Sequence, residues 1–157
     1  MPVQRMEASI SDIADWFLLK GPMSNRRVQK LCYYAEAWSE ALTNRKLAPD
    51  ADFEAWVHGP MNRKLWERFA DFGWREFVLS DPDKVKKRLE TLITDDQQYV
   101  LESVWITYKD LSTDELEMLT RQEEPWLEKR TGCSQFQTSR RRISRAAMRR
   151  YYRSIVS

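Results

Sequence analysis

The sequence predicts an all-α protein, mainly helical, with six to eight helices, one globular domain and at most a minor short β-hairpin. Three observations support this fold class. A length of 157 residues corresponds to one domain. Apolar residues recur at spacings of three and four along most of the chain. Only 4 glycines are present, which disfavours a turn-rich all-β fold.

Helix start and stop signals divide the first part of the chain. Ser9 is expected to cap a first helix that Gly21-Pro22 ends. Ser24 is expected to cap a second helix. This second helix is expected to bury one apolar stripe, made of Val28, Leu31, Ala35, Trp38 and Leu42.

The middle of the chain is less regular. A loop is expected over 44–52, followed by a short strand or extended segment over 53–57. Gly59-Pro60 is expected to break the chain, with Pro60 in the first turn of a helix that Gly73 ends. Residues 77–79 are a second candidate strand, and 80–82 start a further helix.

The second half has the clearest helix starts. Thr94-x-x-Gln97 and Ser112-x-x-Glu115 are capping boxes ahead of apolar runs. A short helix is expected to open at 124–126, followed by a polar loop over 131–139. The last segment predicts an amphipathic helix from about 139 to 155.

Charge is distributed unevenly, although the net charge is only +2. Residues 1–128 hold all 24 acids, whereas residues 129–157 hold nine bases and no acid. A basic helix of this kind can contact phosphates, or an acidic partner protein, or present a solvated face. A protein partner is favoured because no groove-reading module is apparent. The predicted partner-binding residues are Arg142, Arg145, Arg149 and Arg153.

Motifs for catalysis are missing from the sequence, so we expect no enzyme, no catalytic residue, no cofactor and no metal. Phosphate loops, dinucleotide fingerprints and metalloprotease motifs are all lacking. Cys32 and His58 form a candidate nucleophile–base pair, but Cys32 lies in an apolar helix, where a thiol is normally inert. Acidic pairs at 81/83, 95/96 and 123/124 begin predicted helices, where the macrodipole accounts for them.

Hydropathy and aromatic residues complete this picture. The longest apolar run is 16–19, far shorter than a membrane span, so a cytoplasmic protein with no membrane partner is expected. An exposed aromatic patch is an alternative to core packing for Trp56, Trp66, Trp74 and Trp126, and core packing is favoured.

Four stretches together resemble one known family. They are Asp15-Trp16-Phe17-Leu18, VQKLCYYA at 28–35 with Trp38, FEAWVHGPM at 53–61, and 111–120 followed by Pro125-Trp126. In this order they are similar to the Panacea domain, also called the SocA-like antitoxin domain, over about residues 9–126. The matching residues are expected to be structural: Trp16, Lys30, Leu31, Tyr33, Tyr34, Trp38, Trp56, Gly59, Pro60, Pro125 and Trp126.

The resemblance implies a helical domain over 9–130, after an N-terminal extension over 1–8, with 131–157 packed on the same domain. It also implies an antitoxin that binds and neutralises a cognate co-encoded protein toxin of a bacterial or phage toxin–antitoxin system. Toxin contacts are then expected in surface segments: 47–52, 74–93, 131–139 and the basic helix.

Two alternative functions remain open. One is a proteolytic adaptor that delivers a toxin to a AAA+ protease. The other is a nucleic-acid-binding regulator that uses the basic C-terminal helix, although nucleic acid is not expected as the sole partner.

Overall fold

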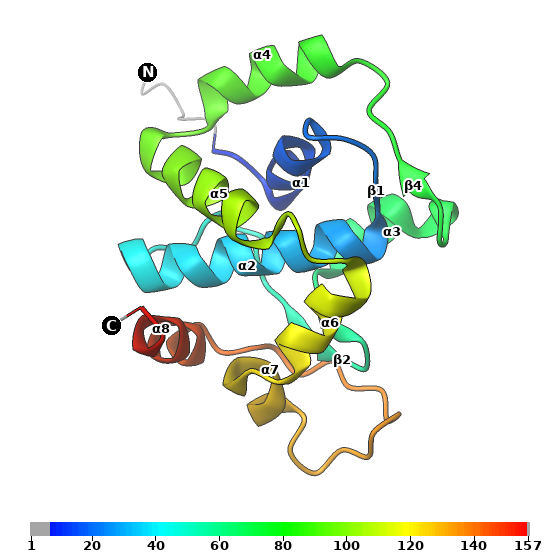
Figure 1. Ribbon diagram of the computed structural model, residues 1–157, viewed down its shortest axis with the longest axis vertical. Helices are drawn as coiled ribbons and strands as arrows, with labels where there is room; N and C mark the ends of the chain where they lie inside the picture. The colour runs from blue at the N-terminus through cyan, green and yellow to red at the C-terminus, as the bar shows by residue number, and fades with distance from the viewer. Residues whose placement is uncertain (1–6, 157) are drawn as a thin grey trace, which may run out of the picture.

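The computed structural model describes residues 7–156, so most of the expected N-terminal extension lies outside the described residues. Within them the chain forms eight α-helices and two small two-stranded antiparallel sheets (Figure 1). The prediction of a mainly helical single domain is confirmed. The helices are α1 Ile10–Leu18, α2 Asn25–Thr43, α3 Arg63–Phe69, α4 Pro82–Leu92, α5 Asp95–Tyr108, α6 Thr113–Arg121, α7 Glu124–Lys129 and α8 Arg145–Ser154.

Helix starts follow the chemistry that the sequence predicts. The side chains of Ser9, Thr94 and Ser112 each accept a hydrogen bond from the backbone N–H three residues on. In each case the residue at that third position returns a bond to the cap, which completes a capping box. Both capping boxes predicted from the sequence are therefore confirmed, and α1 has one as well.

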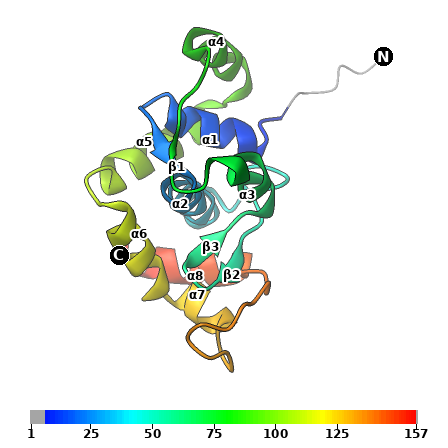
Figure 2. The ribbon, with the colours of Figure 1, turned by 90° about the vertical axis from the view of Figure 1, so that its right-hand side faces the viewer.

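Helix α2 is the centre of the molecule, and Figure 2 looks along it with the other elements arranged around it. Of the apolar stripe predicted on α2, Val28, Leu31 and Ala35 are buried, whereas Trp38 is half-buried. The placement of Leu42 in the core is wrong, because its side chain is 47% exposed. Elements pack on several sides of α2, so burial on this helix does not follow one stripe.

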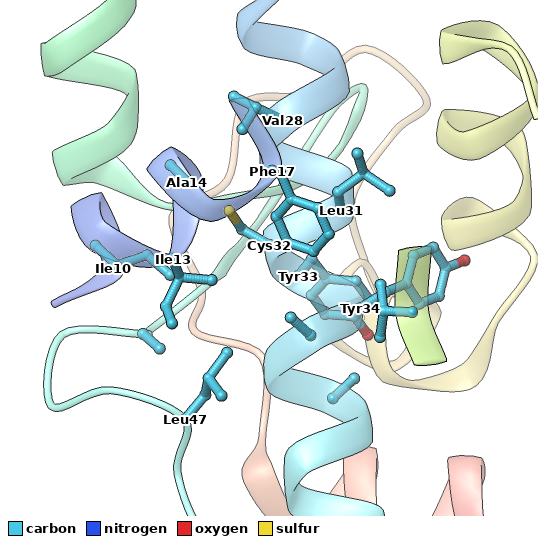
Figure 3. Packing of buried hydrophobic residues seen from close by; sticks show 14 of the residues in the cluster. Ile10, Ile13, Ala14, Phe17, Val28, Leu31, Cys32, Tyr33, Tyr34 and Leu47 are labelled. Atoms are coloured by element: carbon cyan, nitrogen blue, oxygen red, sulfur yellow. The ribbon is translucent and has the colours of Figure 1, made fainter. Parts of the chain in front are cut away.

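The first helix closes one side of this centre. Its apolar residues interdigitate with the first turns of α2, as Figure 3 shows for Ile13, Phe17 and Val28. On the neighbouring side, Tyr34 of α2 stacks on Tyr108 of α5, with ring centroids 4.0 Å apart. The core is thus continuous across α1, α2 and α5.

The two sheets are short. Strand β1 Met23–Ser24 pairs with β4 Glu76–Phe77, and β2 Glu54–Trp56 pairs with β3 Gly59–Met61 as a tight hairpin. A minor hairpin is therefore present. Residues 77–79, the second candidate strand, contribute only Phe77, and it pairs with β1 rather than with β2.

The sequence predicted Pro60 in the first turn of a helix. This prediction is wrong, because Pro60 lies in strand β3. Helix α3 begins at Arg63, because the Asn62 side chain caps it by accepting from the Leu65 N–H at 3.0 Å. Gln29 of α2 holds both backbone groups of Asn62, at 2.8 and 3.0 Å. A partner that is distant in sequence therefore sets this helix start.

The last helix is shorter than predicted. It starts at Arg145, with Ser144 as its cap, and residues 139–144 are not helical. Instead this segment runs beside β2: the Ile143 N–H donates to Phe53 O at 2.7 Å, and the Ala55 N–H donates to Arg141 O at 2.9 Å. Pairing with a strand edge outweighs the helical periodicity of the segment.

Gly59 sits where a side chain would collide with its neighbours. Its φ is +126°, and a Cβ there would lie 2.8 Å from Lys30 Cε and 2.9 Å from Thr120 Oγ1. The hairpin backbone therefore rests directly on the Lys30 stem. Only glycine combines this backbone conformation with this approach.

We expect Gly59→Ala to lower the free energy of unfolding by about 2–4 kcal/mol, because strain and overpacking add. Gly21→Ala is the matched control, since φ is +149° there but no atom lies within 4 Å of the added Cβ. The control should lose only the strain, about 1–2 kcal/mol. Urea unfolding measures both, and equal losses would contradict the close approach to Lys30.

Candidate functional site

Three acidic or basic side chains on α2 have no solvent exposure: Lys30, Glu36 and Glu40. Burial of an unpaired charge is costly, so each needs a partner or must become neutral. The partners come from α6, from the loop after α2 and from α8. These contacts show which of the predicted site residues stabilise the fold and which are exposed at the surface.

Lys30 is held between α6 and the hairpin. Its Nζ lies 3.5 Å from Glu117 Oε2 and donates to Met61 Sδ at 3.4 Å. Arg26 also pairs with Glu117. Burial lowers the pKa of Lys30 to about 8, and the Glu117 carboxylate opposes that shift. Lys30 and Gly59, from two separate motifs, thus meet in one packing contact.

Glu123 lies inside a cluster of tyrosines. Its Oε1 accepts from the Tyr34 hydroxyl at 2.7 Å and from the Tyr152 hydroxyl at 2.8 Å. The Tyr33 and Tyr152 hydroxyls are 3.1 Å apart. Burial raises the pKa of Glu123, and the two tyrosine hydrogen bonds act in the opposite direction. The helix macrodipole therefore does not explain Glu123 of the 123/124 pair, because this side chain links α2, α7 and α8.

The remaining motif residues also make internal contacts. The Trp126 indole donates to Trp56 O at 2.8 Å, and the Trp38 indole donates to the Tyr108 hydroxyl at 2.8 Å. Pro125 is a buried residue of the first turn of α7. All motif residues are buried except Trp38 and Trp56, which are half-buried.

The tryptophans considered for a surface patch differ in their exposure to solvent. Trp126 is in the core, whereas Trp66 is 42% exposed and Trp74 is 80% exposed, so core packing is wrong for these two. The rings of Trp56 and Trp66 lie 6.0 Å apart. Trp74 has the Arg26 guanidinium 5.5 Å from its ring centroid.

Three of the arginines predicted to bind a partner contact α2 of their own chain. Arg145 Nε donates to Glu40 Oε2 at 2.5 Å, and Arg149 donates to Asn44 Oδ1 at 2.9 Å. Arg153 Nε donates to Ala41 O at 3.0 Å. Arg142 precedes α8 rather than lying on it.

Arg142 differs from these three because its side chain is 70% exposed. It makes one long ion pair, 3.9 Å from Asp52. The role of all four arginines in partner binding stays a prediction.

The contact of Arg145 with α2 involves two adjacent acids. Glu36 Oε1 accepts from the Leu47 N–H at 2.7 Å, and the neighbouring Glu40 carboxylate contributes to a raised pKa of Glu36. Burial raises the pKa of Glu36 to about 9, so this carboxyl is protonated at neutral pH. The proton on Glu36 and the guanidinium of Arg145 thus neutralise the two buried acids, and the Arg145–Glu40 pair holds α8 on α2.

A hollow of about 330 Å³ opens beside the hairpin and α7. Arg130 at its wall donates to Ala55 O at 3.2 Å and to Gln137 O at 2.7 Å, and so shapes the loop that follows α7. No acidic residue lines the hollow. The lining residues are Val57, His58, Arg121, Trp126, Arg130, Cys133, Ser134, Gln135 and Phe136. The sequence indicated the 131–139 loop as a surface segment and named His58 only as a candidate base. No local pattern in the sequence placed Arg121 and His58 at one hollow.

Cys32 and His58 occupy different environments. Cys32 is fully buried beside α1, and burial raises the pKa of its thiol, so it is not an activated nucleophile. His58 is exposed in the turn between β2 and β3. Within residues 7–156 no group of three or more His, Cys, Asp or Glu side chains is placed to hold a metal ion. No helix in the same range is long and apolar enough to cross a bilayer.

Fold and surface together define a helical domain whose buried ionisable groups serve packing. Its surface carries exposed aromatic side chains and a basic hollow. Comparison with protein-family models agrees with this class: the model described as antitoxin SocA-like, Panacea domain, matches residues 28–127. The chain belongs to this family, which confirms the resemblance.

The family match has defined limits. Neither the curated proteins nor the solved structures contain a significant match to this chain. The matched range runs from α2 to α7 and omits α1 and α8, including the Asp15–Leu18 stretch. Membership supports an antitoxin role in a toxin–antitoxin system, suggests a non-enzymatic role and implies a toxin partner in general.

We expect Arg145→Ala to lower the free energy of unfolding by about 2 kcal/mol, because Glu40 loses its close ion pair and keeps only Arg149, 3.9 Å away. The guanidinium is 45% exposed, which keeps the loss below that of a fully buried pair. Adding Glu40→Gln should recover at least about 1 kcal/mol in a double-mutant cycle. Arg142→Ala, the control, should cost no more than about 0.5 kcal/mol. Additive losses in the cycle would show that the pair is not coupled.

We expect Glu36→Gln to gain stability relative to the wild type as the pH rises. The folded wild type keeps the Glu36 proton up to about pH 9, whereas the unfolded chain releases it near pH 4.5. Stability from this group is therefore present in full at low pH and lost between these values. Unfolding at about pH 5 and about pH 9 should show a relative gain of at least about 1 kcal/mol. A constant difference would mean that Glu36 is ionised in the fold.

Proposed function

We propose that this protein is a cytoplasmic antitoxin that binds a protein toxin encoded beside it and neutralises that toxin by direct contact. The family match over residues 28–127 carries the proposal. The internal contacts of the motif residues support it, because a family scaffold that holds its shape leaves its surface segments free to suit a particular partner. Neutralisation would be stoichiometric, by covering the toxin's active site.

The expected interface is of standard size, about 800 Å² per partner, with an aromatic or arginine side chain as its anchor. Trp74, Phe136 and Arg142 are exposed side chains of this kind. We propose that Arg142 reaches the toxin directly. Arg145, Arg149 and Arg153 would contribute by positioning α8, since they already contact α2.

A nucleic-acid-binding regulator is less well supported. The contacts of Arg145, Arg149 and Arg153 with α2 leave fewer free guanidinium groups on α8 for phosphates. Phosphate binding would also make the affinity fall steeply with salt. Affinity for duplex DNA that stays weak at low salt would support a protein partner.

The proposal predicts rescue in a growth assay. Expression of the neighbouring reading frame alone should arrest growth, and co-expression of this protein should restore it, with the two proteins co-purifying at a fixed ratio. An unrelated toxin, which this protein should not relieve, is the specificity control. A harmless neighbour, or an arrest that persists, would contradict the pairing.

Toxin half-life distinguishes occlusion from delivery to a AAA+ protease. Occlusion predicts that the toxin persists as long with this protein as without it. A half-life that shortens on co-expression would establish the adaptor instead.

A further inference from the structure

The hollow beside α7 combines free positive charge with apolar walls. Arg121 ends α6, His58 lies in the hairpin turn, and Phe136 of the following loop is 78% exposed at the rim. A volume of about 330 Å³ is at the low end of ligand pockets, which run from roughly 300 to 1,000 Å³. The hollow therefore has room for one or two side chains of a partner.

Arg121 is the unpaired cation of this hollow. In the described part of the chain its guanidinium has no hydrogen-bond or ion-pair partner, although it offers five N–H donors. Its position in the last turn of α6 suits the helix macrodipole, which is worth about 0.3–1 kcal/mol at exposed sites. The macrodipole supplies no acceptor for those donors.

The acids nearest in sequence to Arg121 are already engaged. Glu117 pairs with Arg26 and Lys30. Glu123 accepts from two tyrosine hydroxyls, and both Glu124 and Glu128 pair with Arg150. Residues 129–157, which include the loop over the hollow, contain no acid. The fold therefore supplies Arg121 with no carboxylate of its own.

We propose that this hollow binds an acidic segment of the partner protein, with a carboxylate held by Arg121 and His58 and an adjoining apolar side chain against Phe136. The identity of the partner as a toxin rests on the proposed function. The proposed recognition of a carboxylate by a cationic hollow with aromatic walls does not rest on that function. Arginine is enriched at protein interfaces and binds carboxylates through paired donors, which suits this role.

His58 is the one histidine of the chain, so its ring signals in an NMR spectrum report on the hollow without ambiguity. We would titrate the full chain with a hexaglutamate peptide and, at matched ionic strength, with inorganic phosphate. The peptide should shift the His58 ring signals in a saturable manner at millimolar concentrations. The effect of phosphate should be smaller and not saturable.

Arg121→Gln should weaken the peptide at least about tenfold, the effect of losing one charge-assisted hydrogen bond. The control Lys87→Gln removes an exposed charge from α4, which lies at the opposite end of the molecule from α7, and should change the affinity less than twofold (Figure 1). Thermal unfolding would verify that both variants fold. Absence of a saturable shift, equal effects of phosphate and peptide, or an unaltered Arg121→Gln affinity would each overturn the proposal. Tighter binding of a single-stranded oligonucleotide than of the peptide would do so too.

The second arm uses the toxin from the growth assay. Arg121→Glu should weaken the complex at least about tenfold, whereas Lys87→Glu should change it less than twofold. An unchanged complex with Arg121→Glu would overturn the inference and leave the antitoxin function standing. A wild-type protein that binds no toxin would end the proposed function, and the peptide titration would still decide the hollow.

Discussion

The structure depends on the burial of ionisable side chains along its central helix. Lys30, Glu36 and Glu40 point out of α2 at positions that exclude water, and an unpaired charge there would cost several kcal/mol. Each group is therefore matched by a segment outside α2: Lys30 by Glu117 of α6, Glu36 by the Leu47 N–H of the loop that follows α2, and Glu40 by Arg145 of α8. Apolar packing provides the driving force for the fold, whereas these polar contacts allow each outer segment one position on α2.

The same contacts distinguish the residues that hold the fold together from those that remain at the surface. Helix α8 lies outside the range that matches the family, yet its Tyr152 and Arg145 complete the polar network of α2. The chain that leads from α7 to α8 lines the basic hollow with residues 133–136 and then runs beside β2. The chain thus anchors both ends of this segment in the core and leaves its middle at the surface. A scaffold of this type can hold its shape while the exposed segment is fitted to one partner.

Much of the fold follows from local sequence, because capping boxes and apolar periodicity act within a few residues; α1, α5 and α6 were all predictable in this way. The errors arise where a distant partner decides. Gln29 holds Asn62 at the start of α3, so Pro60 lies in a strand before that helix. Residues 139–144 run along the edge of β2 and are therefore not helical. Periodicity also cannot show that Glu40 is buried, since its counter-ion Arg145 is 105 positions away. For the same reason the arginines of α8 looked free in the sequence, and the unpaired Arg121 did not stand out.

Helix α8 belongs to the folded unit before any partner arrives, because the Glu40–Arg145 contact holds it on α2 and the Glu123–Tyr152 contact holds it at the start of α7. Native-state hydrogen exchange of the free protein tests this directly. The account predicts that the amides of α8 are protected to the same degree as those of α2 and open together with them, while α4, in which only Leu89 is buried, opens earlier. Amides of α8 that exchange at the rate of an unfolded peptide while α2 stays protected would contradict it.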